Sequence, residues 1–106
     1  MTTLSSYDAV KIAREHVEAK GFRLKCGSNQ SEAVYLALPG YDGLLRIAAH
    51  TCRHPAGVVE SLEFVYREAW QRDENDIGLC IEQVIEYADW AIEAFMAAAD
   101  EEEEDE

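Results

Sequence analysis

The second half of this 106-residue chain is almost without basic residues. Residues 1–55 contain seven lysines and arginines and five acids, whereas residues 56–106 contain only Arg67 and Arg72 against seventeen acids. The charge is therefore +2 in the first half and −15 in the second, within a total of −13. Such a charge distribution repels nucleic acid and anionic membranes and attracts basic partners.

The chain also lacks a long apolar run and a targeting signal. No stretch approaches the ~20 apolar residues that a membrane helix requires. The first ten residues, MTTLSSYDAV, have neither the basic nor the apolar segment of a signal peptide. The three cysteines, Cys26, Cys52 and Cys80, are an odd number and lie far apart, which is typical of free thiols in a reducing compartment. We therefore expect a cytoplasmic protein that does not bind membranes.

What the chain does contain is enough apolar sequence for one folded domain. Hydrophobic residues make up 48% of the composition, and the length is that of a single domain. We expect an α+β domain over residues 1–99, followed by an acidic, disordered tail at 100–106. The tail reinforces the negative field but is not its only source, because residues 56–99 alone carry −8.

Both ends of the domain have helical periodicity. Near the N-terminus, Ser5 or Ser6 can cap a helix that Gly21 ends, with an apolar face of Ala9, Ile12, Ala13, His16 and Val17. A long second helix is predicted from Ile77 to about Ala99, capped by Asn75 or Asp76. Its apolar positions repeat every three or four residues and include Cys80 as a core residue; the others are Ile77, Ile81, Val84, Ile85, Ala88, Ile92 and Phe95.

Between the helices the pattern favours strands. Residues 22–26 alternate apolar and basic side chains, and residues 32–38 and 44–50 flank the turn sequence PGYDG. Residues 58–66 fit a strand or a helix face, and their Val, Phe and Tyr content favours a strand. The predicted fold is an N-terminal helix, a three- to four-stranded antiparallel sheet arranged as a meander, and a long C-terminal helix packed on one face.

A turn centred on Tyr41 fixes the register of the predicted hairpin. Leu36 then lies opposite Arg46, and Glu32 lies opposite His50. The face expected to lie against the helices carries Ala33, Tyr35, Ala37, Leu45, Ile47 and Ala49. A slip of one residue would break all of these pairs.

Sequence motifs for catalysis or metal binding are weak. His50, Cys52 and His54 are spaced two apart, which would place them on one face of a continuing strand, but the chain offers no second ligand pair for zinc. A Cys–His nucleophile has no local signature here, and no glycine-rich loop for phosphate follows a strand. The basic cluster of Lys20, Arg23 and Lys25 is small within a strongly negative molecule. We expect no enzyme, no cofactor, no metal and no direct binding of nucleic acid.

An acidic row on the second helix is the most informative pattern. Glu82, Glu86, Asp89 and Glu93 are spaced four, three and four residues apart, which is the repeat of one helix face. Carboxylates four apart are ~6 Å apart along the axis, comparable with the phosphate spacing along a DNA strand. An ordinary solvated face pairs acids with lysines, yet no lysine or arginine follows Arg72. The row therefore indicates a surface for a basic partner, with plain solubility as the alternative.

The predicted binding surface extends beyond this row. Trp90 and Tyr87 flank the row and can anchor on arginine or on an apolar pocket. Further acids before the helix can lengthen the track; the full set of predicted partner-binding residues is Glu60, Glu63, Glu68, Asp73, Glu74, Asp76, Glu82, Glu86, Asp89, Trp90 and Glu93.

The middle of the chain, SEAVYLALPGYDGLLRIAAH, resembles a pattern in small proteins of phages and other mobile elements. In that pattern serines and a tyrosine on one strand precede an Arg-Ile/Val-Ser/Ala-Asp-His segment on the next. The matching positions are Ser28, Ser31, Tyr35, Arg46, Ile47, Ala48 and His50, and Ala49 stands where the pattern usually has Asp. A purely structural interpretation is a polar brace across the hairpin, with Arg46 and His50 on one strand face and Glu32 opposite.

Size, charge and this resemblance together are similar to anti-CRISPR proteins. Several small acidic members of that group act as DNA mimics on the DNA-binding surface of a type I Cascade complex. The resemblance implies inhibition by binding, a Cas effector surface as the partner, a monomeric protein and a bacterial host cytoplasm. The alternative is a non-catalytic regulatory or structural module of a mobile element. Such a module can form a homodimer through a sheet edge, and its acidic face then serves solubility.

Overall fold

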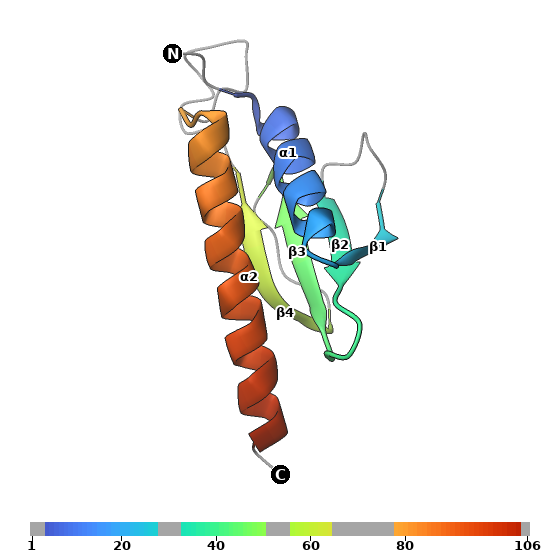
Figure 1. Cartoon of the computed structure of the whole chain (residues 1–106). Helices are drawn as coiled ribbons and strands as arrows, with labels where there is room; N and C mark the ends of the chain where they lie inside the picture. Colours follow the sequence, from blue (N-terminus) through green and yellow to red (C-terminus); the bar gives the residue numbers. More distant parts are fainter. Residues whose placement is uncertain (1–3, 28–32, 51–55, 65–77, 105–106) are drawn as a thin grey trace.

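The computed structural model has two layers, with both helices on one face of a four-stranded sheet (Figure 1). It describes residues 4–27, 33–50, 56–64 and 78–104, and side chains only up to residue 98 of the last range. The predicted α+β architecture is confirmed, including a strand rather than a helix near residue 60. The elements are α1 (Ser6–Ala19), β1 (Arg23–Cys26), β2 (Ala33–Ala37), β3 (Leu44–Ala48), β4 (Val58–Glu63) and α2 (Ile81–Glu104).

Helix α1 follows from its local sequence. The Ser5 side chain accepts a hydrogen bond from the backbone N–H of Asp8 at 3.1 Å, which caps the first turn. Gly21, at a φ of 108°, lets the chain reverse after the helix, and its N–H donates to the Glu18 carbonyl at 3.0 Å. The buried face consists of Ser6, Ala9, Val10, Ala13 and Val17.

The β2–β3 hairpin is antiparallel as predicted, but its register differs by one residue. Tyr35 lies opposite Arg46, and Leu36 lies opposite Leu45, so the expected Leu36–Arg46 pair is wrong. On β2 the slip reverses the faces, because side chains alternate along a strand. Val34 and Leu36 are buried in the core, whereas Ala33, Tyr35 and Ala37 lie on the other face. On β3 the predicted core residues Leu45 and Ile47 are confirmed.

The fourth strand makes the sheet mixed rather than wholly antiparallel. The strand order is β1-β2-β3-β4, and β4 runs parallel to β3 with Arg46 beside Ser61. Backbone hydrogen bonds close both ends of this pair: the Leu44 N–H donates to the Gly57 carbonyl, and the Phe64 N–H donates to the Ala48 carbonyl, each at 2.8 Å. Parallel pairing means that the chain after β3 returns to the start of that strand before β4 begins, which corrects the predicted meander.

Helix α2 begins and ends later than the sequence predicts. It starts at Ile81, not Ile77, and the Cys80 N–H donates to the Gln83 side chain at 3.0 Å in place of the expected cap. The expected caps Asn75 and Asp76, like Ile77, lie outside the described residues. Its backbone is helical to Glu104, beyond the predicted end near Ala99, and the predicted disorder of the acidic tail stays a prediction.

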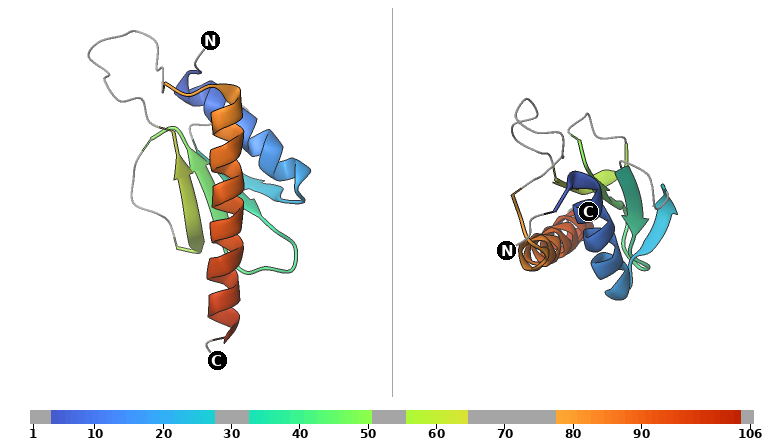
Figure 2. Two further views of the ribbon diagram at one scale, coloured as in Figure 1. Left: turned by 60° about the vertical axis from the view of Figure 1, so that its left-hand side comes forward. Right: turned by 90° about the horizontal axis from the view of Figure 1, so that it is seen from above.

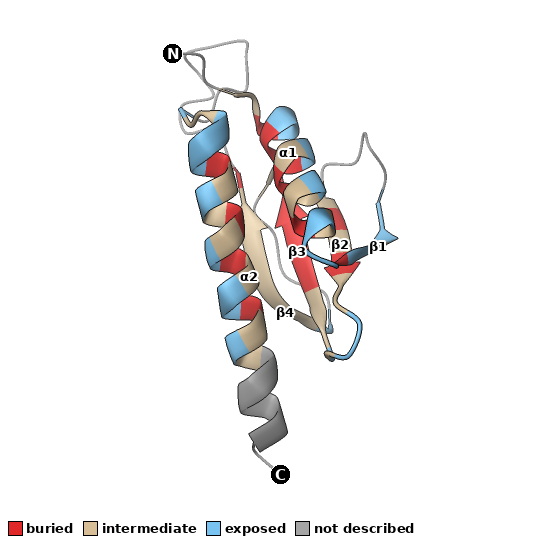
Figure 3. Ribbon diagram, in the orientation of Figure 1, coloured by how far each residue is buried: buried red, intermediate tan, exposed pale blue. Residues whose placement is uncertain are grey.

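The core lies between the two helices and the sheet. Phe95 of α2 contacts Phe22 edge to face, with ring centroids 5.2 Å apart, and Tyr41 at 6.1 Å. Buried positions of α1, α2 and β3 face one another across this layer (Figure 3). Ile81 does not join them, contrary to the sequence prediction, because it is 51% exposed at the first turn of α2. Among the described residues, no helix is both long and apolar enough to cross a membrane.

A first prediction concerns the turn that leads into β3. Gly40 and Gly43 both have positive φ, at 92° and 97°, so an alanine at either position costs about 1 kcal/mol. A Cβ at Gly43 would also lie 2.7 Å from the Val59 Cγ1 atom, whereas one at Gly40 meets nothing within 4 Å. Gly43→Ala should therefore lower the free energy of unfolding by at least ~1 kcal/mol more than Gly40→Ala. Equal losses in denaturant titrations would contradict the close approach of β4 to this turn.

Candidate functional site

The acidic row lies on the side of α2 that faces away from the sheet. Its buried side is formed by Val84, Ala88, Ala91 and Phe95, and the acids occupy the opposite positions of the helical repeat. Glu82, Glu86 and Glu93 are exposed, as predicted, and Asp89 is partly exposed. Figure 3 shows the exposed positions of α2 along its outer side. The row therefore presents carboxylates over about 16 Å of a straight element.

Three of these carboxylates have no counter-charge in the part of the chain that the structure describes. Among the described residues, no ion pair involves Glu82, Glu86 or Glu93. Asp89 is different, because its Oδ1 atom lies 2.7 Å from Nε2 of His16 on α1. This contact joins the two helices side by side (Figure 2). Asp89 thus contributes to helix packing as well as to the acidic surface.

The charge of α2 is of one sign along its whole length. Residues 81–104 contain nine acids and no lysine, arginine or histidine. The helix has 24 residues, so it is about 36 Å long. Acids near a helix C-terminus interact unfavourably with the helix dipole, and no basic residue in the last turn offsets them. The acidic sequence therefore destabilises this helix in isolation. A positive charge on another molecule would relieve the repulsion among the carboxylates and with the helix dipole.

The acids before α2 fall into two groups. Glu60 and Glu63 lie on β4 and are half-buried. Glu63 lies 2.6 Å from an Arg46 nitrogen, so its charge is neutralised inside the protein. The remaining predicted acids, Glu68, Asp73, Glu74 and Asp76, lie outside the described residues.

Two aromatic side chains border the acidic row. Trp90 is 55% exposed, and Tyr87, one turn earlier, is half-buried. Their ring centroids are 5.0 Å apart with an interplanar angle of 48°. An exposed aromatic ring therefore lies on the same helix as the three carboxylates that form no ion pair among the described residues.

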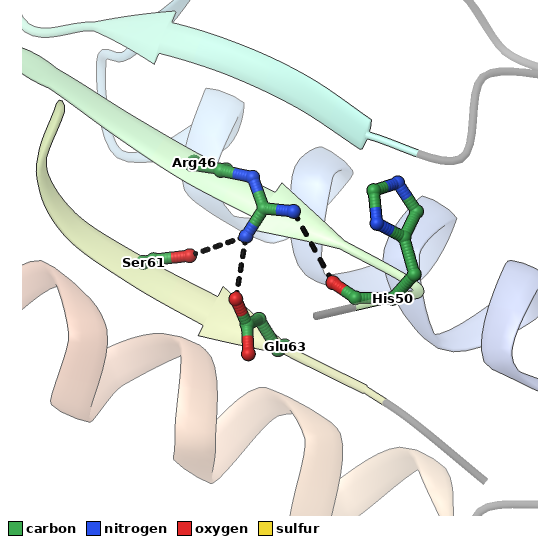
Figure 4. Close-up of polar contacts among 4 residues, drawn as sticks. All are labelled: Arg46, His50, Ser61 and Glu63. Carbon is green, nitrogen blue, oxygen red and sulfur yellow. Dashed lines mark hydrogen bonds and ion pairs between the residues drawn. The ribbon is translucent and has the colours of Figure 1, made fainter. Parts of the chain in front are cut away.

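On the other face of the sheet, a buried arginine joins β3 to β4 (Figure 4). Arg46 is fully buried. Its guanidinium donates to the Ser61 hydroxyl at 2.9 Å, to the Glu63 carboxylate at 2.6 Å and to the His50 backbone carbonyl at 3.2 Å. The sequence indicates a polar brace that involves Arg46 and His50, but it does not reveal the two partners on β4. The carboxylate predicted for this brace, Glu32, lies outside the described residues.

The remaining candidates for chemistry receive no support from the described part of the chain. Cys52 and His54 lie outside it, so their relation to His50 is not described. Within it, no group of three or more His, Cys, Asp or Glu side chains is placed to hold a metal ion. Cys80 precedes α2 and is half-buried rather than a core residue of the helix. The described geometry shows exposed carboxylates along the outer side of α2.

No protein-family model, curated protein or solved structure matches this chain.

A second prediction tests the buried brace. Glu63→Ala leaves the Arg46 guanidinium buried without its carboxylate, which should lower the free energy of unfolding by about 3 kcal/mol. Glu60→Ala, on the same strand but in no ion pair among the described residues, should cost less than about 1 kcal/mol.

The double variant Arg46→Met, Glu63→Leu separates charge from packing. Replacing both partners by apolar residues of similar size removes the unpaired charge, so it should restore most of the lost stability. Chemical denaturation of all three variants measures these differences. If Glu63→Ala and Glu60→Ala unfold at the same denaturant concentration, the brace does not stabilise the fold.

Proposed function

We propose that this protein is an inhibitor that acts by binding, with the outer face of α2 occupying a basic DNA-binding surface of another protein. The observation that carries the proposal is the exposed set of Glu82, Glu86 and Glu93, which have no counter-charge among the described residues. These carboxylates are held on a helix whose other side is buried in the core. The backbone positions that carry them are therefore held in place before a partner binds.

The physical basis is electrostatic complementarity. A surface that binds DNA carries lysine and arginine side chains that neutralise phosphates and thereby release the cations condensed on the DNA. A row of fixed carboxylates can take the place of those phosphates, and the opposite charges accelerate association. Because both ligands use the same cations, the bound protein excludes DNA. No catalytic residue is required for inhibition of this kind, so we infer that the protein is not an enzyme.

The partner class follows from the resemblance to small phage proteins. Anti-CRISPR proteins of the DNA-mimic type act on type I Cascade complexes, and we place this chain with that activity as a proposal. The site of action is then the cytoplasm of the host bacterium. The acids on α2 would be the main contacts, and the helical extension to Glu104 would lengthen the anionic track.

The competing proposal is a homodimer joined through a sheet edge, with the acidic surface serving solubility. One edge is β1, which has four residues and an irregular register between Leu24 and Cys26. Its exposed side chains include Arg23 and Lys25. Pairing of two such strands would bring like charges together, which is unfavourable. This observation favours the inhibitor over a dimer through β1.

A third prediction uses charge removal on α2. In the triple variant Glu82→Gln, Glu86→Gln, Glu93→Gln the helix is retained, and Asp89 stays because of its contact with His16. Affinity for purified type I Cascade should fall roughly tenfold to a hundredfold, and the loss should shrink between ~50 mM and ~500 mM salt. Displacement of labelled target DNA, followed by fluorescence anisotropy, measures the effect.

A control variant with the same charge change tests whether position matters. Asp8, Glu15 and Asp42 are exposed and lie off α2, so Asp8→Asn, Glu15→Gln, Asp42→Asn should displace DNA nearly as well as the wild type. Two results contradict the proposal: a wild-type protein that displaces DNA from no type I complex, and a triple α2 variant that displaces it as well as the wild type. The dimer alternative instead predicts a mass of twice 11.9 kDa in light scattering.

A further inference from the structure

Trp90 is exposed on a helix whose other large apolar side chains mostly pack against the protein. Its exposed fraction is 55%, compared with 0% for Phe95 on the same helix. Exposing an indole to water is unfavourable, and tryptophan is among the residues most enriched at binding hot spots. Solubility or long-range steering would explain the negative charge of this helix. Neither of them requires an exposed aromatic ring at position 90.

The surroundings of Trp90 are chemically specific. Glu86 lies four residues before it and Glu93 three residues after it, so both are its neighbours on the helix surface. Both are exposed and form no ion pair among the described residues. The Tyr87 ring contacts the indole, with ring centroids 5.0 Å apart. A flat apolar ring is thus bordered by two unneutralised carboxylates.

This combination matches one side chain better than any other. A guanidinium is planar and weakly hydrated, stacks on aromatic faces and donates to carboxylates in its own plane. A lysine ammonium is a compact, strongly hydrated charge that gains less from the ring. Among the described residues no cation contacts Trp90, and Arg14 of α1 is paired with Glu18. The described part of the chain therefore supplies no cation for this ring, and a basic partner can supply one.

We propose that Trp90, Glu86 and Glu93 form an arginine-binding site on the outer face of α2. The occupant is an arginine side chain of the basic partner, stacked on the indole and hydrogen-bonded to one or both glutamates. This inference rests on the proposed function for the source of the arginine, and it adds a specificity: the partner surface must present arginine, not lysine alone, opposite the second half of the acidic row.

The test compares two peptides of equal charge. Nona-arginine and nona-lysine are titrated into the full-length protein by isothermal calorimetry at ~50 mM salt. Wild type should bind nona-arginine about threefold to tenfold more tightly than nona-lysine. Trp90→Leu, which keeps apolar bulk without a π face, should reduce this ratio to about one, whereas Trp90→Phe should keep part of it.

A second exposed aromatic provides the matched control. Tyr7 on α1 is 44% exposed, so Tyr7→Leu removes an exposed ring that does not belong to α2 and should leave the ratio unchanged. Glu86→Gln, Glu93→Gln should weaken both peptides and also lower the ratio, because the carboxylates orient the guanidinium.

The outcomes separate this inference from the proposed function. Equal binding of the two peptides by wild type, or a preference for arginine that Trp90→Leu retains, overturns the arginine site and leaves the charge-based inhibitor standing. Failure of both peptides to bind also overturns it. Conversely, a preference that depends on Trp90 supports the site even if no type I complex is inhibited.

Discussion

The buried side of α2 is the constraint on which the functional surface depends. Val84, Ala88, Ala91 and Phe95 have to face the sheet and α1, because they complete the core. That requirement fixes the rotation of the helix, so the acids half a turn away must face solvent. A single hydrophobic contact layer thus both stabilises the fold and orients a row of carboxylates. The contact between His16 and Asp89 fixes the same rotation from the side of α1.

The reverse face of the sheet has a different role. There the Arg46–Glu63 ion pair, 2.6 Å long, ties the parallel strand β4 to β3. A buried pair of this kind confers little net stability relative to apolar residues but strongly penalises any arrangement that separates its members. We interpret it as a device that specifies the position of β4, against which α2 also packs. Glu63 on β4 therefore serves the fold, and acids on the outer side of α2 remain for a partner.

Local signals were sufficient for part of this structure. A cap at Ser5 or Ser6 and the end of the first helix before Gly21 are encoded within a few residues, and the sequence predicts both correctly. The hairpin register is not encoded by such local signals. Both faces of β2 are apolar, with Ala33, Tyr35 and Ala37 on one and Val34 and Leu36 on the other, so periodicity does not identify the face that packs on the helices. The pairing of Arg46 with Glu63 spans 17 residues and depends on the direction of β4. No pattern within either strand encodes that direction, which is why the sequence does not reveal Glu63 as a partner of Arg46.

The central claim is that the outer face of α2 and DNA compete for one basic surface. Native mass spectrometry of a purified type I Cascade complex, mixed with target DNA and this protein in excess, tests that claim directly. The account predicts complexes that contain either DNA or the protein, with the fraction bound to DNA falling as the protein concentration rises. A ternary complex holding both ligands would show that the two surfaces differ, and would contradict the account.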